Sequence, residues 1–316
     1  MRKLAVFIVG MFLLASSAEA QFDAQFSQYW VVENYYNPAK AGSERNKLNL
    51  TGLYRMQWIG MPGAPKTIFV TGEAGLDFFG RTHGVGASFF SEKIGLYSLS
   101  TVSLQYAFKL KLLNGVLSMG LEAGLGDLAF DGSGLYTPQG NEYHNATDDG
   151  ILNTDVKGSR LNVNFGVRYA TEHYYAGFSS TKLTEPMYDY TDLVSTYIGR
   201  IYYLTAGGNI TLNNPLYQFR PSFLVKTDFL STQIDVTARV LYNEMFWGGV
   251  SYRWKEALIF SIGANIRNIQ AGYAYDHSMS AIGGANSGCH EFTLTYTVDL
   301  NFSKNNRYRY KSVRIL

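Results

Sequence analysis

The residues that could carry acid–base chemistry are few and scattered along the chain. The histidines are His83, His144, His173, His277 and His290. His290 adjoins an acid, Glu291, and an imidazole beside a carboxylate is common in general acid–base catalysis. Successive residues of a strand point to opposite faces, however, so in a strand these two side chains cannot form a direct dyad. The sequence also contains no HExxH, GxSxG, CxxC or phosphate-loop pattern. We therefore expect no catalytic residue, no cofactor and no metal.

Two other reactive features have plainer interpretations. Asp148 and Asp149 lie in the long stretch 128–158 and could help to bind calcium, but a solvated acidic loop is the favoured interpretation. Cys289 is the single cysteine, so the chain cannot form an internal disulfide. We interpret Cys289 as a small residue at the start of a strand.

Alternation of apolar and polar residues is the main structural signal. In residues 48–58, Leu50, Tyr54 and Trp58 fall on one face with other apolar residues. Asn49, Thr51, Arg55 and Gln57 fall on the other, with Leu53 as the one misfit. Because side chains of a strand alternate between its two faces, this segment has one apolar and one polar face.

The same alternation recurs along the chain and predicts strands of about the 9–11 residues that a tilted membrane strand needs. The predicted strands are 47–58, 67–77, 84–91, 96–109, 116–127, 159–169, 173–181, 200–211, 217–227, 232–242, 246–254, 257–267, 269–276 and 289–301. The pattern indicates an all-β protein: a transmembrane antiparallel up-and-down β-barrel of the outer-membrane type with about 14 strands.

The gaps between these strands favour a membrane barrel over a soluble sandwich. The long gaps are 59–66, 128–158, 182–199 and 277–288, and all follow odd-numbered strands. The even gaps are short. Outer-membrane barrels place short turns in the periplasm and long loops outside, so both termini are expected in the periplasm. The loop 183–198 could hold a short helix.

Composition agrees with a single large sheet. The 316 residues include 24 Tyr, 20 Phe and 32 Gly but only 7 Pro. The formal charge of +2 argues against nucleic acid as a partner. After the N-terminus, no apolar run approaches the roughly 18 residues of a membrane-spanning helix. A membrane location therefore requires a closed barrel, which leaves no unpaired backbone groups in lipid.

The two ends of the chain differ from the barrel. Arg2 and Lys3, an apolar run from Leu4 to Ala15, and Ala18-Glu19-Ala20 predict a signal peptide over residues 1–20. Residues 21–45 form an irregular periplasmic or plug segment, and residues 46–302 form the barrel. Residues 303–316 are a basic tail without acids, placed in the periplasm.

The predicted inner face carries charges of both signs. Its members include Arg55, Glu73, Gln105, Glu122, Arg168, Lys226, Asp235, Arg239, Arg253, Arg267, Asp276, Glu291 and Asp299. An open porin can show such a face, and so can a plugged barrel. Because buried charges need partners, residues 21–45 are a candidate plug that enters from the periplasmic side.

Several short motifs resemble the PorP/SprF family of the type IX secretion system of Bacteroidetes. Residues 23–29 read DAQFSQY and residues 37–42 read NPAKAG. Residues 55–65 read RMQWIGMPGAP, 272–276 read GYAYD, 288–291 read GCHE and 312–316 read SVRIL. The departures from the family's pattern are Ala24 for Pro, Lys40 for Tyr, Cys289 for Ser and Val313 for Pro.

The resemblance implies a non-enzymatic outer-membrane component that helps to secrete or anchor a cargo protein, such as an adhesin, through the cargo's C-terminal domain. The implied partners are the secretion apparatus with its periplasmic ring proteins, the cargo and outer-membrane lipid. A plugged channel for a small solute and an outer-membrane hydrolase are the alternatives. Contacts with a partner are expected at Gln25, Phe26, Tyr29, Asn37, Pro38, Arg55, Asp276, His290, Glu291 and Arg314.

Overall fold

The computed structural model describes residues 23–78, 80–132, 156–189, 195–280, 283–284 and 286–300. The predicted signal peptide, the basic tail with Arg314, and the Asp148–Asp149 pair lie outside these residues.

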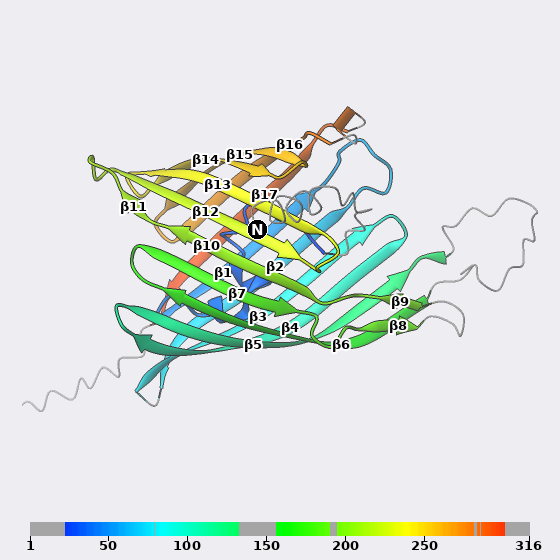
Figure 1. Ribbon diagram of the computed structural model, residues 1–316, viewed down its shortest axis with the longest axis horizontal. Helices are drawn as coiled ribbons and strands as arrows, with labels where there is room; N and C mark the ends of the chain where they lie inside the picture. The colour runs from blue at the N-terminus through cyan, green and yellow to red at the C-terminus, as the bar shows by residue number, and fades with distance from the viewer. Residues whose placement is uncertain are drawn as a thin grey trace, which may run out of the picture.

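The chain folds into one closed antiparallel barrel (Figure 1). The barrel strands are β1 (Lys47–Met56), β2 (Lys66–Phe78), β3 (Arg81–Ile94), β4 (Tyr97–Leu112), β5 (Gly115–Phe130), β6 (Val156–Ala170), β7 (Tyr174–Thr181), β10 (Ile201–Gly208), β11 (Ile210–Thr211), β12 (Tyr217–Thr227), β13 (Thr232–Tyr242), β14 (Phe246–Arg253), β15 (Ala257–Ile266), β16 (Ile269–Ser278) and β17 (Cys289–Asp299). The sheet closes because β1 pairs with β17 and β10 pairs with both β7 and β12. β10 and β11 both pair with β12 and form one strand interrupted at Asn209, so the 15 strands make a 14-strand barrel. This confirms the predicted fold class.

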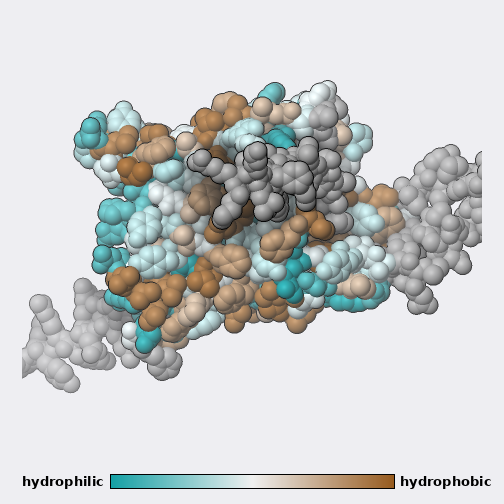
Figure 2. Space-filling model, in the orientation of Figure 1, coloured by the Kyte–Doolittle hydropathy of each residue, from teal (hydrophilic) through white to brown (hydrophobic). Residues whose placement is uncertain are grey.

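The two faces of the wall are inverted relative to a soluble protein. On β4, Val102 and Leu104 are 59% and 68% exposed, whereas Ser103 and Gln105 between and beside them are each 4% exposed. Figure 2 shows apolar side chains over much of the wall, with hydrophilic ones gathered at the end where the short turns lie. Apolar residues outside and polar residues inside suit a wall that faces lipid.

Among the described residues, no helix is long and apolar enough to cross a membrane.

The connections differ between the two ends of the barrel. The long connections after β1, β5, β7 and β16 share one end, which we call the long-loop end. The turns after β2, β4, β6, β11, β13 and β15 are short and share the opposite, short-turn end. β1 begins and β17 ends at the short-turn end, where Lys47 lies opposite Asp299. The predicted grouping of long and short gaps is therefore present.

Two details differ from the sequence prediction. The described residues of the loop, 183–189 and 195–198, hold no helix: they contain the paired strands β8 (Met187–Asp189) and β9 (Ser195–Tyr197). Several strands are also longer than predicted, and β3 covers Arg81–Ile94 rather than 84–91. Apolar and polar residues alternate strongly only where one face of a strand meets lipid. The hydrogen bonds between strands continue beyond the lipid, where the sequence shows no such alternation, so the ends of the strands were not predicted.

The N-terminal segment, residues 23–45, lies inside the barrel (Figure 1). It contains α2 (Glu33–Tyr36) and the 3-10 turn η1 (Pro38–Lys40). Phe26 and Val32 have no exposed surface, and Tyr36 has almost none. They pack with apolar residues of the inner face, including Leu53. Leu53, the apolar residue on the polar face of β1, thus faces inward like its polar neighbours on that face. Its side chain packs against the N-terminal segment.

Glycines of the inner wall give the segment room. A Cβ on Gly120 of β5 would lie 2.2 Å from the backbone nitrogen of Ala39, closer than any stable contact. Gly42 has φ +57, and a Cβ added there would lie 2.3 Å from the carbonyl oxygen of Ala74. Both the backbone conformation and the close contact therefore favour glycine at this position. Backbone-to-backbone packing at these points explains glycines that strand propensity alone disfavours.

Replacing Gly120 with valine should therefore displace η1 from β5. Overpacking of this kind costs about 1–3 kcal/mol, and we expect a lower unfolding temperature in detergent and faster proteolysis of the N-terminal segment. Gly52→Val is the matched control, because nothing lies within 4 Å of a Cβ at Gly52. Equal unfolding temperatures for the two variants would show that the segment does not pack here.

Candidate functional site

A buried ionic network joins the N-terminal segment to the barrel wall at Arg55. The Arg55 side chain is 1% exposed. Its Nη2 lies 2.8 Å from Oδ2 of Asp276, and its Nη1 lies 3.2 Å from Oε2 of Glu291. Arg55 stands directly across from Glu291 in the β1–β17 ladder, and β16 with Asp276 is the next strand along. Three neighbouring strands thus bring one cation and two anions together.

The N-terminal segment completes this network. Arg55 Nη1 donates to Ser27 Oγ at 2.6 Å, and Ser27 Oγ donates to both carboxylate oxygens of Asp276 at 2.5 and 2.7 Å. The backbone N–H groups of Ser27 and Gln28 donate to Glu291 at 2.8 and 2.7 Å. Hydrogen bonds to an ionised acceptor are about twice as strong as neutral ones. The segment therefore contributes directly to stabilising the buried carboxylates.

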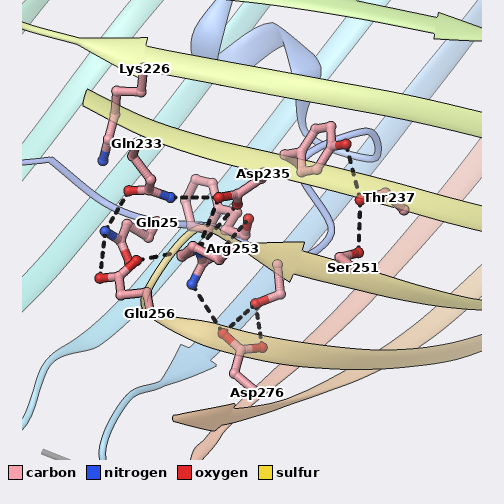
Figure 3. Close-up of polar contacts among 12 residues, drawn as sticks. Gln25, Lys226, Gln233, Asp235, Thr237, Ser251, Arg253, Glu256 and Asp276 are labelled. Atoms are coloured by element: carbon pink, nitrogen blue, oxygen red, sulfur yellow. Dashed lines mark hydrogen bonds and ion pairs between the residues drawn. The ribbon is translucent and has the colours of Figure 1, made fainter. Parts of the chain in front are cut away.

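A second guanidinium extends the network across β14 (Figure 3). Arg253 Nε lies 3.1 Å from Oδ2 of Asp235, and its Nη1 lies 3.3 Å from Oδ2 of Asp276. Its Nη2 donates to the carbonyl oxygen of Phe26 at 3.4 Å. Gln25 donates to Gln233 at 2.6 Å and to Glu256 at 3.3 Å. Asp276 thus links both arginines, and Phe26 is held by its backbone as well as by its ring.

Carboxylates outnumber guanidinium groups within this network. Arg55 and Arg253 face the buried carboxylates of Asp235, Asp276 and Glu291, and Arg253 also lies 3.6 Å from the more exposed Glu256. Two N–H groups of the segment help to stabilise the excess negative charge at Glu291. Removing one member of a buried pair leaves its partner uncompensated, which costs about 3–5 kcal/mol.

Asp23 anchors the start of the described segment. Lys182 Nζ lies 3.2 Å from its Oδ1, Tyr35 donates to the same oxygen at 2.9 Å, and Tyr203 donates to Oδ2. Burial works to raise the pKa of Asp23, but the nearby Lys182 and Lys226 ammonium groups hold that pKa below its ordinary value. Lys182 directly follows β7 at the long-loop end, so the segment runs through the lumen from that half to the short-turn end.

Tyr29 and Asn37 attach the segment to other parts of the wall. The Tyr29 hydroxyl lies 2.8 Å from Ser222 Oγ and donates to Thr237 at 3.0 Å; burial raises the pKa of Tyr29 to about 12. The Asn37 amide donates to the carbonyl oxygens of Val167 and Phe178 at 3.1 and 3.4 Å, and its Oδ1 caps η1 by accepting from the Ala39 N–H.

Two small cavities lie beside the segment. A cavity of about 50 Å³ lies beside Asp23, Tyr35 and Glu122. A second, of about 40 Å³, lies beside Arg55, Gln57 and Cys289. Such volumes hold about one to a few water molecules. Within the described residues, no group of three or more His, Cys, Asp or Glu is placed to hold a metal ion.

The structure brings together five of the residues predicted as a partner site: Gln25, Phe26, Arg55, Asp276 and Glu291. Tyr29, Asn37 and Pro38 are buried elsewhere along the segment. His290 faces the other side of β17 from Glu291, and its Nδ1 lies 2.7 Å from the Tyr273 hydroxyl. Binding of another protein by these residues stays a prediction.

Sequence reasoning placed Arg253 and Asp235 on the inner face but missed them as members of this site. It also missed Ser27, Gln28 and Asp23, although all three lie in the DAQFSQY motif. Their position in this motif was the one sequence feature that could have marked them as members of the site. Several of their partners are more than 150 residues away in sequence, as for Ser27 and Glu291, and no local pattern marks such pairs.

Known structures resemble the fold at low identity. The CymD monoaromatic hydrocarbon channel has a TM-score of 0.48 and 11% identity, over 84% of this chain and 91% of that one. A Pseudomonas aeruginosa FadL homologue has a TM-score of 0.42 and 12% identity, over 80% and 89%. The translocator domain of the autotransporter NalP from Neisseria meningitidis has a TM-score of 0.39 and 9% identity, over 79% and 87%. These likenesses say nothing about what this chain binds.

The sequence matches no curated protein significantly.

The closed barrel with its lipid-facing apolar wall defines an outer-membrane β-barrel protein. The family described as "Type IX secretion system membrane protein PorP/SprF" matches residues 18–296. The chain belongs to this family. It is therefore an outer-membrane component associated with the type IX secretion system.

Replacing Arg55 with alanine should destabilise the barrel by about 3–5 kcal/mol, because Asp276 and Glu291 lose their shared cation. Denaturant unfolding in detergent micelles measures this change. Arg267→Ala is the control, because Arg267 is exposed in the β15–β16 turn and surface changes usually stay within about 0.5 kcal/mol. Similar effects of the two substitutions would mean that the network contributes little stability.

Proposed function

We propose that this protein is a closed barrel that assists the secretion or surface anchoring of a cargo protein, adhesin-like in kind, through the cargo's C-terminal domain. The carrying observation is the N-terminal segment, which lies in the lumen and is bonded to the wall by the Arg55 network. A wide conducting pore needs a continuous hydrated lumen, whereas here Asp23 and Glu33 of the segment are paired with the wall. The spaces beside the segment are separate: two small cavities and one pocket of about 290 Å³ at the short-turn end. This favours a docking role over solute transport.

We propose that the short-turn end faces the periplasm, as in other outer-membrane barrels. Both ends of the barrel sheet then lie on the side of the periplasmic ring proteins, and the basic tail 303–316 would meet them there. The N-terminal segment would act as a plug that enters from the same side, since the chain leaves the lumen there to begin β1.

The opposite, long-loop end would then face the cargo. The β8–β9 hairpin is fixed to the barrel because Tyr188 is buried against Leu128 and Ile198. Arg160 also pairs with Asp189 at 2.9 Å. The hairpin exposes about half of the Met187 and Tyr197 side chains, 49% and 51%. An ordered element with exposed apolar side chains is suited to binding a protein.

The occluded lumen predicts low conductance. In planar bilayers, the full mature chain should give no large steady pore, because the N-terminal segment fills the lumen. Arg55→Ala should give more frequent transient openings, and Arg267→Ala should behave like the unmodified chain. A large steady pore in the unmodified protein would contradict the plug and favour a solute channel.

The secretion role predicts a specific loss. Deleting the gene should mislocalise one secreted protein while nutrient uptake stays normal. Mass spectrometry of proteins co-purified from outer membranes should identify that cargo together with secretion-apparatus components. Recovery of lipid and general porins only, with an uptake defect in the deletion strain, would overturn the proposal.

A further inference from the structure

The lumen has a second polar site at the short-turn end, separate from the Arg55 network. It is a pocket of about 290 Å³ whose walls include Arg168, Arg220, Arg239, His173 and Tyr175. Turn residues 171–173 form part of its rim, so it opens at the short-turn end. Three guanidinium groups therefore line one pocket.

Two of these arginines form no contact ion pair among the described residues, and the nearby acid that acts on Arg220 is Glu244, which is not on the pocket wall. Arg168 is paired, because its Nε lies 2.7 Å from Glu33 Oε1. Arg220 donates only to neutral acceptors, Asn209 at 3.2 Å and Gln218 at 2.9 Å. Arg239 contacts the rings of Trp30 and Trp247, with its Cζ 4.2 and 5.8 Å from their centroids. Its buried Nε has no hydrogen-bond acceptor in the described structure.

The register of the sheet forces these two cations together. Arg220 of β12 and Arg239 of β13 lie directly opposite one another in the ladder. Like charges directly across a ladder are destabilising. By contrast, Arg55 and Arg253 of the Arg55 network each have a carboxylate in contact. Glu172 is the acid on the pocket wall, and it is exposed in the turn.

We propose that this pocket binds an oxyanion, a carboxylate or phosphate group, presented from solution at the short-turn end. A guanidinium group offers a planar fork of donors that matches two oxygens of such a group. One bound anion would bridge Arg220 and Arg239, relieve their repulsion and supply an acceptor to the free Nε of Arg239. The cation–π contacts of Arg239 leave its in-plane N–H donors available for this role.

Binding is tested with the full mature protein in detergent micelles. Inorganic phosphate should bind saturably by calorimetry and raise the unfolding temperature above that in sodium chloride of equal ionic strength. Arg220→Gln and Arg239→Gln should each weaken phosphate binding about tenfold or more, because each removes a charged hydrogen-bond donor to the anion. Arg267→Gln removes the same charge from the same end outside the pocket and should leave the affinity unchanged.

A triglutamate peptide forms the second arm and distinguishes the sources of the anion. Tighter binding of phosphate assigns the pocket to a small free anion, and tighter binding of the peptide assigns it to an acidic segment of a protein. Heat-dependent migration in gels checks that each variant is folded. Arg239→Gln could unfold the protein because it removes contacts with two tryptophan rings. Arg220 has no such contacts, so the affinity of Arg220→Gln still tests the proposal. Affinities equal across the unmodified chain, Arg220→Gln and Arg267→Gln, or no binding of either probe, would overturn the proposal.

Discussion

The pairing of buried charge inside a lipid-facing wall is the constraint on which the rest of this structure depends. The wall must be apolar outside, so polar and ionic side chains gather inside. An arginine as buried as Arg55 is tolerated only with anions and hydrogen bonds in contact. Asp276 and Glu291 provide the charge, and Ser27 and Gln28 provide the hydrogen bonds. The N-terminal segment is thus a structural member of the barrel interior.

Small residues and apolar residues of the inner face follow from the same constraint. Backbone atoms of the segment approach β3 and β5 so closely that only glycine fits at Gly84 and Gly120. Leu53 and Phe69 are among the apolar residues of the inner face that pack in one cluster with Phe26. Burying a side chain such as Phe26 contributes about 1.5–3 kcal/mol. Shape, apolar contact and charge therefore all hold the segment in one place.

Much of the fold was predictable because a membrane strand carries its own signal. Residues of β1 and β4 alternate at period two, so strand number, facing and the grouping of long connections could be read directly. The ends of β3 and the β8–β9 hairpin could not, because outside the lipid zone apolar and polar residues need not alternate along a strand. The candidate site was half predictable. Arg55, Asp276 and Glu291 stand in recognisable motifs, whereas Arg253 and Asp235 belong to no motif.

The sequence by itself determined that this chain is a 14-strand outer-membrane barrel of the PorP/SprF family, because alternation and short motifs are local properties. Only the tertiary structure decided that the motifs at residues 23–29, 55–65, 272–276 and 288–291 meet in one buried network. It also decided that Arg220 and Arg239 lie face to face, with neither in a contact ion pair among the described residues. Both results depend on strand register and barrel closure, which bring together residues that are far apart in sequence and that no local pattern connects.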